Sequence, residues 1–481
     1  MATLRSPGAA FRALAWCAIL LGTAARVFTV VVRPLWADEI FTLTLARKSV
    51  PEILAALRVD SGPPLHYFAA HVLLAPFGAV PGSADILVRV LSLAASLLHI
   101  PLLFLVARRL GRPASGLTAG ALFAISPLAV AYAAEGRAYA LASLLVLLAF
   151  ERALALLETP RLGVAVGLSL AAGGAVLTHY LAVFPVAALA VLAWDARPRS
   201  RQALVFSGLA AAAIAGMWIP TAVVQPRASM AWSLGSAFSG ALRDFPANLA
   251  FGAPAGGPAG GIATTVLGAA GALLLAGLVA RAWKGAFAPA ARVLAVSLVL
   301  LAAGQIAARA LVLPERTALV FLPFAALLLA EAPPAIPALA GAVSTALLAL
   351  WLPRVLEPSP GALVARLLEM PARAGRRVLA ADYWGPELDY RLARAGAPGR
   401  VTLFPSDVAA HPGWYREEQV SGVRLAAEAA AAFAGDPAPT IFVLPRGSRS
   451  SAALATHLGL ARRLLASPLL DVVEMPAPPA R

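Results

Sequence analysis

Long runs of apolar residues separated by short polar loops dominate the chain up to about residue 353. A run of about 18 or more apolar residues is long enough to cross a bilayer as a helix. The pattern predicts eleven membrane spans, over about 11–32, 85–107, 113–133, 138–157, 162–178, 180–194, 203–223, 262–280, 290–312, 317–331 and 335–352. We therefore expect a polytopic α-helical membrane protein.

The loop over 33–84, between the first two predicted spans, has a pattern of its own. Apolar residues recur at the spacing of an amphipathic helix over 50–57, and Ser49 with Glu52 forms a capping box that would start this helix. The stretch DSGPPLHYFAAHVLLAPFG (60–78) adds an apolar helix that is too short to span comfortably. Both helices are expected to lie along the membrane surface. If the second one spans instead, every later loop changes side.

From about residue 371 short strands alternate with helices. The segments RRVLAAD, GRVTLF, PTIFVLP and LLDVVEM predict strands, and PELDYRLARAG, LAAEAAAAFAG and SSAALATHLGLARRLLA predict helices. Such alternation is typical of a small α/β domain. We expect a membrane domain over 1–353, which includes the 33–84 loop, and an extracytoplasmic α/β domain over 354–481. No glycine-rich phosphate-binding fingerprint opens a helix of the second domain, so no cofactor is assigned to it.

The composition agrees with a membrane protein. Of the 481 residues 60% are hydrophobic, and the mean hydropathy is +0.80, more than a soluble protein of this length could bury. The single cysteine, Cys17, excludes a disulfide framework and a cysteine metal site. His66 and His71 are five residues apart and do not form the i, i+4 pair of many zinc sites. The residues assign no cofactor and leave a divalent metal open.

The formal net charge of +15 invites comparison with nucleic-acid-binding proteins. The basic residues lie mostly in short loops between apolar runs, however, which is the distribution of a membrane topology signal. With the N-terminus inside, the cytoplasmic loops hold Arg108, Arg109, Arg112, Arg161, Arg197, Arg199, Arg201, Arg281 and Lys284. We therefore expect no nucleic acid as a partner, and this orientation places residues 38–39 on the outer face.

The N-terminus resembles a signal peptide, because Arg5 and Arg12 precede the first apolar run. That run extends to about Val32, whereas the apolar core of a cleaved signal is about 7–15 residues long. We expect it to be a retained membrane span.

Two adjacent carboxylates, Asp38 and Glu39, follow this span in the segment WADEIFTL. In one interpretation they only solvate the membrane boundary. In the other, one carboxylate acts as a general base that takes a proton from an attacking hydroxyl, while its neighbour orients that hydroxyl or a ligand. The spacing alone does not decide between the two.

The segment AEGRAYAL (134–141) carries Glu135, Arg137 and Tyr139 at an outer junction of two predicted spans. A charge at the bilayer centre costs about 2.5–3.5 kcal/mol on insertion scales, so ionisable residues near membrane depth usually have a partner or a function. The planar fork of Arg137 suits a phosphate or a carboxylate. The alternative is a Glu–Arg pair that merely closes a helical hairpin.

Two further outer junctions carry polar groups. LTHYLAVF places His179 and Tyr180 at a tight turn, and LPERTALVFLP places Glu315 and Arg316 at the start of a span. A lone histidine is more often an ordinary hydrogen-bonding residue than a catalyst or ligand. The gathering of such groups on one side of the membrane is what favours a functional site.

These segments together resemble a known family. WADEIFTL, DSGPPLHYFAAHVL, SPLAVAYAAEGRAYAL, THYLAVF and PERTALVFLPFAALLLA occur in the order found in the GT-C membrane glycosyltransferases of family 39, and they cover about residues 15–335. That group includes the protein O-mannosyltransferases and, more distantly, the aminoarabinose transferases of lipid A. The chain departs from the pattern at Gly62, where the family often has His, and at His66, where it often has Tyr.

The resemblance implies a GT-C-like fold and a glycosyltransferase that uses a polyprenyl-phosphate-linked sugar and a hydroxyl acceptor in a glycan, lipid or protein. It implies an integral protein of a bacterial inner membrane whose site faces the periplasm or the exterior. Carried over by position, Asp38 and Glu39 would be catalytic, with Asp38 as the base, and Arg137 and Arg316 would contact the donor phosphate. The other residues placed at the substrate are Asp60, His66, Tyr67, Glu135, Tyr139, His179 and Tyr180.

The implied chemistry is coherent. When a sugar leaves a lipid phosphate, negative charge grows at the leaving oxygen, and arginine stabilises that charge. A phosphate leaves well enough to need no general acid. A single carboxylate that activates the acceptor hydroxyl therefore implies attack from the opposite face and inversion of the anomeric centre.

Two other functions stay open. A transporter or lipid flippase places ionisable groups and broken helices near the bilayer midplane, often in repeated halves, whereas here the polar groups gather at one face and no internal repeat is visible. A structural or assembly subunit would bind a partner through the outer domain and carry a degenerate catalytic half. The intact Asp38, Glu39 and Arg137 argue against it.

Overall fold

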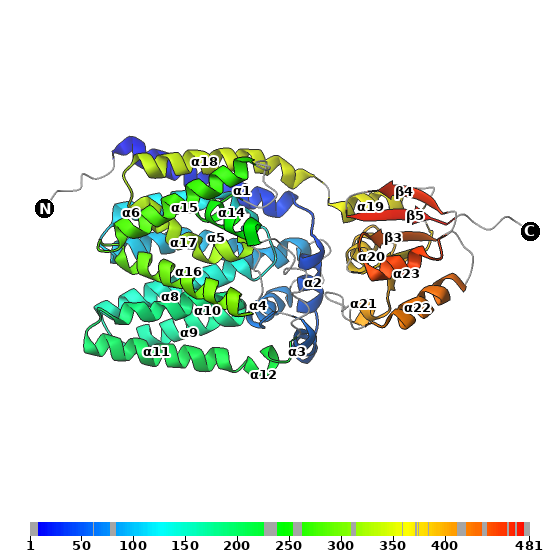
Figure 1. Cartoon of the computed structure of the whole chain (residues 1–481), viewed down its shortest axis with the longest axis horizontal. Helices are drawn as coiled ribbons and strands as arrows, with labels where there is room; N and C mark the ends of the chain where they lie inside the picture. Colours follow the sequence, from blue (N-terminus) through cyan, green and yellow to red (C-terminus); the bar gives the residue numbers. More distant parts are fainter. Residues whose placement is uncertain are drawn as a thin grey trace, which may run out of the picture. The chain divides into compact units, whose positions relative to one another are not determined.

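The chain divides into two compact units in a computed structural model (Figure 1). The described residues are 8–60, 62–76, 83–225, 238–253, 262–308, 314–357, 359–370, 373, 375–382, 384–410, 420–434, 440–458, 461–466 and 469–475. The helical unit comprises Met1–Arg33 and Ser61–Leu356, and the α/β unit comprises Pro34–Asp60 and Glu357–Arg481. The sequence placed the loop that holds 34–60 in the membrane domain, whereas this segment groups with the C-terminal fold.

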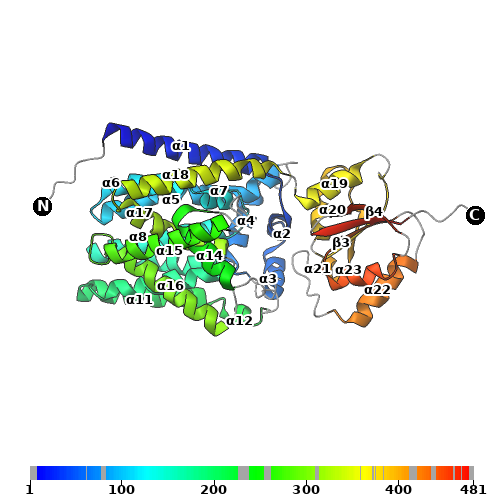
Figure 2. The ribbon, with the colours of Figure 1, turned by 45° about the horizontal axis from the view of Figure 1, so that its top comes forward.

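The helical unit is a bundle of α-helices joined mostly by short turns (Figures 1 and 2). Its elements are α1 (Ala9–Val32), α4 (Leu65–Leu74), α5 (Ser83–Arg109), α6 (Pro113–Ile125), α7 (Pro127–Ala133), α8 (Tyr139–Glu158), α9 (Leu162–Thr178), η1 (Tyr180–Ala182), α10 (Val183–Ala188), η2 (Leu189–Ala193), α11 (Pro198–Gly216), α12 (Ile219–Ala222), α14 (Phe238–Phe251), α15 (Ile262–Ala282), α16 (Ala288–Ala308), α17 (Pro314–Ala330), α18 (Ala335–Trp351) and η4 (Leu352–Leu356). Helices α8, α9 and α11 lie side by side in both views. In the buried centre, Phe150 of α8 packs edge to face on Phe324 of α17, with ring centres 5.1 Å apart.

Among the described residues, six helices are long and apolar enough to cross a membrane, and the bent pair α6–α7 passes the same test as one span. Shorter apolar helices include Leu65–Leu74, Leu162–Thr178 and Arg316–Ala330. The prediction of a polytopic helical membrane protein is confirmed, and the count of eleven spans stays a prediction. The span expected over 180–194 is divided into η1, α10 and η2.

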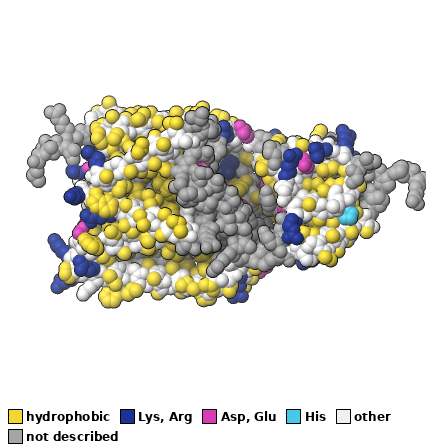
Figure 3. Space-filling model, viewed as in Figure 1, with side chains coloured by type: hydrophobic (Ala, Val, Ile, Leu, Met, Phe, Trp, Pro, Cys, Tyr) yellow, Lys and Arg dark blue, Asp and Glu magenta, His cyan; other side chains and the backbone are white. Residues whose placement is uncertain are grey.

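The surface of the helical unit is that of a protein solvated by lipid. Large apolar side chains such as Leu20, Phe206 and Leu273 are 66%, 70% and 77% exposed, and apolar side chains cover the flank of the unit in Figure 3. Soluble monomers rarely expose apolar patches of that extent. On the face shown, Lys and Arg gather at the end of the unit where α6 and α11 begin.

The 65° bend between α6 and α7 has an identifiable cause. Pro127 has no backbone N–H, and the Leu128 N–H donates to the Gly252 carbonyl (2.9 Å) instead of continuing the helix. The Ala124 carbonyl, left open at this break, accepts a hydrogen bond from the fully buried guanidinium of Arg26 in α1. Such a partner is required, because an unsatisfied backbone group in an apolar interior costs several kcal/mol. The bend leads the chain into the α7–α8 turn, which carries AEGRAY.

The α/β unit is built on a five-stranded sheet with the order β2-β1-β3-β5-β4. Its strands are β1 (Val378–Ala381), β2 (Val401–Phe404), β3 (Ile441–Pro445), β4 (Arg462–Ala466) and β5 (Leu470–Glu474). β1 pairs in parallel with β2 and β3, and β5 pairs antiparallel with β3 and β4. The helices of the unit are α2 (Ala37–Ala46), α3 (Val50–Val59), α19 (Pro360–Glu369), α20 (Trp384–Arg394), α21 (Asp407–Ala410), α22 (Gly422–Ala434) and α23 (Arg449–Ala455).

One predicted helix of this unit is wrong in its second half. The segment SSAALATHLGLARRLLA was expected to be one helix, but α23 ends at Ala455 and Arg462–Ala466 forms the edge strand β4. Leu, Arg and Ala favour helix. Pairing with β5, interrupted by an irregularity between Arg463 and Leu465, overrides that local preference.

The helix predicted over 50–57 is confirmed as α3. The Ser49 N–H donates to Glu52 Oε2 (2.9 Å), and the Ser49 hydroxyl lies 2.5 Å from the same oxygen, as a capping box requires. Ile53 and Leu57, one turn apart on the apolar face, are fully buried. Asp60 ends the helix, its N–H donating to the Ala56 carbonyl (3.1 Å).

Candidate functional site

The acidic pair lies in the first turn of α2, where the helix dipole favours carboxylates. Glu39 is fully buried, and its Oε2 accepts a hydrogen bond from the Trp36 N–H (3.3 Å). This contact satisfies a backbone donor that a helix start leaves open. Asp38 is only partly buried. The two carboxylates therefore differ in environment: Glu39 closes the start of α2 from a buried position, whereas Asp38 keeps part of its surface exposed.

Arg137 lies in the turn between α7 and α8 and is held from several sides. Its Nη1 donates to the Tyr67 hydroxyl of α4 (3.4 Å), and its own carbonyl accepts from the Ser92 hydroxyl of α5 (3.1 Å). The buried ring of His66 places Nε2 3.3 Å from the Gly136 carbonyl in the same turn. These contacts fix the backbone on which the guanidinium is mounted.

A second arginine reaches the same region from α17. Arg316 Nη1 donates to the Tyr139 hydroxyl (3.0 Å), and its guanidinium carbon lies 5.5 Å from the centre of that ring. The Tyr139 ring is in turn 5.2 Å from the ring of His179. Arg316 of α17 thus reaches the start of α8, where Tyr139 follows Arg137 by two residues.

Glu135 connects this turn to the end of α1. Its Oε1 lies 3.9 Å from Nη2 of Arg33. The buried Arg89 of α5 fixes that end, because its Nη1 donates to the carbonyls of Val30 (3.0 Å) and Arg33 (2.5 Å). Sequence reasoning missed Arg89. The available signal was an arginine inside the span predicted over 85–107, since such residues rarely lack a role.

Tyr180 belongs to a neighbouring network. Its hydroxyl donates to Gln225 Oε1 (2.5 Å) and accepts from Trp218 Nε1 (2.9 Å), and Gln225 Nε2 donates to the Gly62 carbonyl (3.0 Å). Tyr180 and Trp218 also line an apolar groove of about 640 Å³ between α9, α10 and α11. Leu168, Val176, Leu204, Leu209 and Ile219 are among its other lining residues.

The structure brings seven of the predicted residues together in the helical unit. Side-chain contacts join Tyr67 to Arg137, and Tyr139 to Arg316 and His179, while Glu135, Arg137 and Tyr139 belong to one turn. The seven residues, called the arginine cluster below, are His66, Tyr67, Glu135, Arg137, Tyr139, His179 and Arg316. Asp38, Glu39 and Asp60 lie in the α/β unit. The side chain of Glu315 lies outside the described residues. Within the described ranges, no three His, Cys, Asp or Glu side chains lie close enough together to hold a metal ion.

The sequence over residues 61–220 matches the family model of the dolichyl-phosphate-mannose-protein mannosyltransferases. This stretch contains every member of the arginine cluster except Arg316. The chain matches no curated protein sequence.

Several solved structures are similar to the chain, including the following three. ArnT from Cupriavidus metallidurans bound to undecaprenyl phosphate is 14% identical, with 96% of this chain and 98% of that chain covered and a TM-score of 0.60. The apo state of the same protein is 15% identical over the same shares, with a TM-score of 0.48. The apo oligosaccharyltransferase of Archaeoglobus fulgidus is 14% identical over 90% of this chain and 69% of that chain, with a TM-score of 0.49. The chain therefore has the fold of the GT-C superfamily of membrane glycosyltransferases, as its sequence segments predicted.

Proposed function

We propose that the chain is a membrane glycosyltransferase that moves a sugar from a polyprenyl-phosphate donor to a hydroxyl acceptor, with Asp38 as the general base. The observation that carries this proposal is the bond from Arg316 of α17 to the hydroxyl of Tyr139, two residues after Arg137, because it brings a second arginine to the α7–α8 turn. Two arginines at one partly buried turn favour an anionic ligand there. A phosphate accepts the paired N–H bonds that arginine offers.

The apolar groove beside the cluster supports a lipid-linked donor. Tyr180 lines the groove, and the preceding residue, His179, belongs to the arginine cluster. A phosphate bound by Arg137 and Arg316 would therefore have the apolar groove nearby for its polyprenyl chain. The similar ArnT structure holds undecaprenyl phosphate, a ligand of this chemical class.

The proposed step is an inverting displacement. The acceptor hydroxyl oxygen forms a bond to the anomeric carbon as the bond from that carbon to the donor phosphate oxygen breaks. Asp38 takes the hydroxyl proton, and the electron pair of the broken bond stays on the phosphate. Arg137 and Arg316 stabilise the charge that grows on that oxygen. Glu39 contributes through the start of α2, where it caps the Trp36 N–H.

Release of free lipid phosphate tests the proposal. Purified protein would be loaded with a panel of polyprenyl-phosphate sugars, together with envelope glycans and lipids as acceptors. We expect at least one donor to yield lipid phosphate and a glycosylated acceptor with inverted configuration. A transporter or flippase would move the lipid-linked sugar without cleaving it. Movement of intact donor across vesicles, with no release from any member of the panel, would favour that alternative.

We also propose that the chain lies in a bacterial inner membrane with the α/β unit outside the cytoplasm. The gathering of basic side chains at the end where α6 and α11 begin supports this orientation, because basic loops stay in the cytoplasm. In a Cys17→Ser background, Val423→Cys of α22, at an 83% exposed position, should react with an impermeant maleimide on intact spheroplasts.

Leu162→Cys is the matched control, because Leu162 is 82% exposed at the start of α9. It should react only in inverted vesicles. The reverse labelling pattern would overturn the orientation, and with it the assignment of Asp38 to the outer face.

A further inference from the structure

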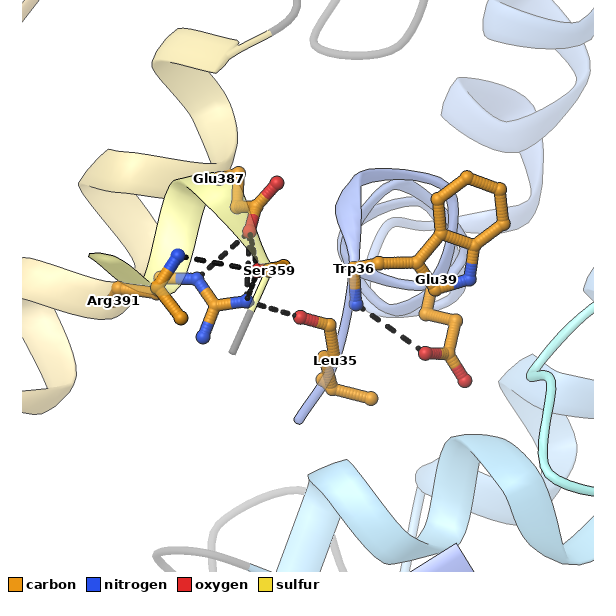
Figure 4. A network of polar contacts seen from close by, with 7 residues as sticks. Leu35, Trp36, Glu39, Ser359, Glu387 and Arg391 are labelled. Carbon is orange, nitrogen blue, oxygen red and sulfur yellow. Dashed lines mark hydrogen bonds and ion pairs between the residues drawn. The ribbon is translucent and has the colours of Figure 1, made fainter. Parts of the chain in front are cut away.

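Arg391 of α20 connects the start of α2 to the C-terminal fold (Figure 4). Its Nη2 donates to the Leu35 carbonyl (2.5 Å). Its Nε and Nη2 donate to Oε1 of Glu387, at 2.9 and 2.7 Å, and Nη2 lies 3.2 Å from the Ser359 hydroxyl. One guanidinium therefore bridges three separate segments of the chain: the residue before the cap of α2, the start of α19, and α20 itself.

The bridge is rigid because its acidic partner is buried and tightly enclosed. The side chains of Glu387 and Arg391 are only 2% and 15% exposed. Burial raises the pKa of Glu387, and the charge of Arg391 opposes that rise. A Cβ added at Gly361 would lie 2.3 Å from Glu387 Oε1, so α19 can approach the carboxylate this closely only with glycine there. Ser359, the N-cap of α19, donates to the same oxygen (3.4 Å).

The contact at Leu35 is not isolated, because α2 packs on α20. Asp38 lies three residues after Leu35, in the turn that this contact anchors.

We propose that Arg391 is a positioning residue for transfer, because its bond to the Leu35 carbonyl sets the direction in which α2 starts and so the orientation of Asp38. This inference rests on the proposed function, which assigns the base to Asp38. It makes the C-terminal fold a part of the catalytic apparatus. A misplacement of about 1 Å at a reacting group can cost about 10²-fold in rate, so the loss of one anchoring bond is measurable.

Arg391→Ala should lower kcat by about 10–10²-fold. The KM for the lipid donor should change little, since the proposed phosphate contacts of Arg137 and Arg316 lie in the helical unit. Arg391→Lys should recover part of the rate, because a lysine can reach Glu387 or Leu35 but cannot bridge both with a planar fork. Gly361→Ala removes no charge yet displaces Glu387, and it should lower kcat in the same way.

Arg424→Ala is the matched control. Arg424 bonds Asp407 and Glu428, both at 2.9 Å, in the same unit. Its other hydrogen bonds in the described part of the chain are to Ser406 and Ser421, which lie outside α2. This variant should leave kcat unchanged, and any loss of melting temperature it causes calibrates the effect of a broken ion pair. An equal loss of kcat in Arg424→Ala and Arg391→Ala would overturn the positioning role and leave only a stabilising one.

A double mutant separates this inference from the proposed function. If Arg391 acts through Asp38, Arg391→Ala should add almost nothing to the loss in an Asp38→Asn background. If the rate losses of Arg391→Ala and Asp38→Asn multiply in the double mutant, the inference is overturned. It is also overturned if Arg391→Ala keeps the wild-type kcat while Asp38→Asn is inactive. A fully active Asp38→Asn protein would instead contradict the proposed base, whatever the Arg391 variants do.

Discussion

Asp38→Asn should lower the rate of sugar transfer by about 10²–10⁴-fold, because loss of a general base typically costs that much. Asparagine has the size of aspartate and can still accept a hydrogen bond, but it cannot take the acceptor proton. The protein should stay folded and inserted, since Asp38 is only partly buried. Single-turnover release of lipid phosphate measures the chemical step, and the melting temperature reports the fold.

Glu39→Gln serves as the comparison within the same helix turn. Glu39 caps the Trp36 N–H, and glutamine keeps an oxygen for that bond but loses the negative charge at the helix start, which contributes about 0.3–1 kcal/mol. We expect Glu39→Gln to lower stability and to reduce the rate far less than Asp38→Asn does. Asp38→Asn turnover at the wild-type rate would rule out Asp38 as the base. A larger rate loss in Glu39→Gln would exchange the roles of the two carboxylates.

Arg137→Ala should weaken donor binding and also slow the chemical step. Phosphate charge is present in the bound donor and increases at the leaving oxygen, so both ground state and transition state lose a partner. A hydrogen bond to a charged group contributes about 1.5–3 kcal/mol, which corresponds to about 10–10²-fold in donor affinity. Arg137→Lys keeps the charge but loses the paired geometry, and it should also be impaired. Direct titration with the lipid donor measures the affinity.

The competing explanation is that Arg137 and Glu135 merely close the turn between α7 and α8. In that case Arg137→Ala and Glu135→Gln should lower the melting temperature similarly, and neither should change donor affinity. Arg316→Ala provides a second test of phosphate binding, because Arg316 lies on a separate helix, α17. This variant should also bind the lipid donor more weakly. Unaltered donor affinity in both arginine variants would remove the phosphate site from the proposal.

The fold class and the arginine cluster could be predicted from sequence because their signals are local. Apolar runs mark spans wherever they occur, and polar residues at span ends are conspicuous against an apolar background. The cluster at Arg137, His179 and Arg316 was therefore visible as separate outer junctions. What joins them was not visible, since Tyr139 contacts both Arg316 and His179 only after distant helices pack.

Contacts to backbone atoms were the part that sequence could not supply. Arg391 bonds the Leu35 carbonyl across 356 residues, and every residue has a carbonyl, so no residue type marks the partner. Arg26 and the Ala124 carbonyl form the same kind of pair inside the helical unit. The helix prediction for the segment that forms the edge strand β4 was wrong for a related reason. Pairing with β5 outweighs the helix preference of the segment's own residues.

The sequence separation between Leu35 and Arg391 has a consequence for how the protein is made. A ribosome adds about 5–20 residues per second, so the first outer loop exists for roughly 20–70 s before Arg391 is synthesised. During that interval α2 has left the translocation machinery without its anchor. A nascent or truncated chain would then carry Arg137 and Arg316, the proposed phosphate contacts, without the anchor proposed to orient Asp38. On this proposal, coupling the first loop to the last domain delays activity until translation is complete.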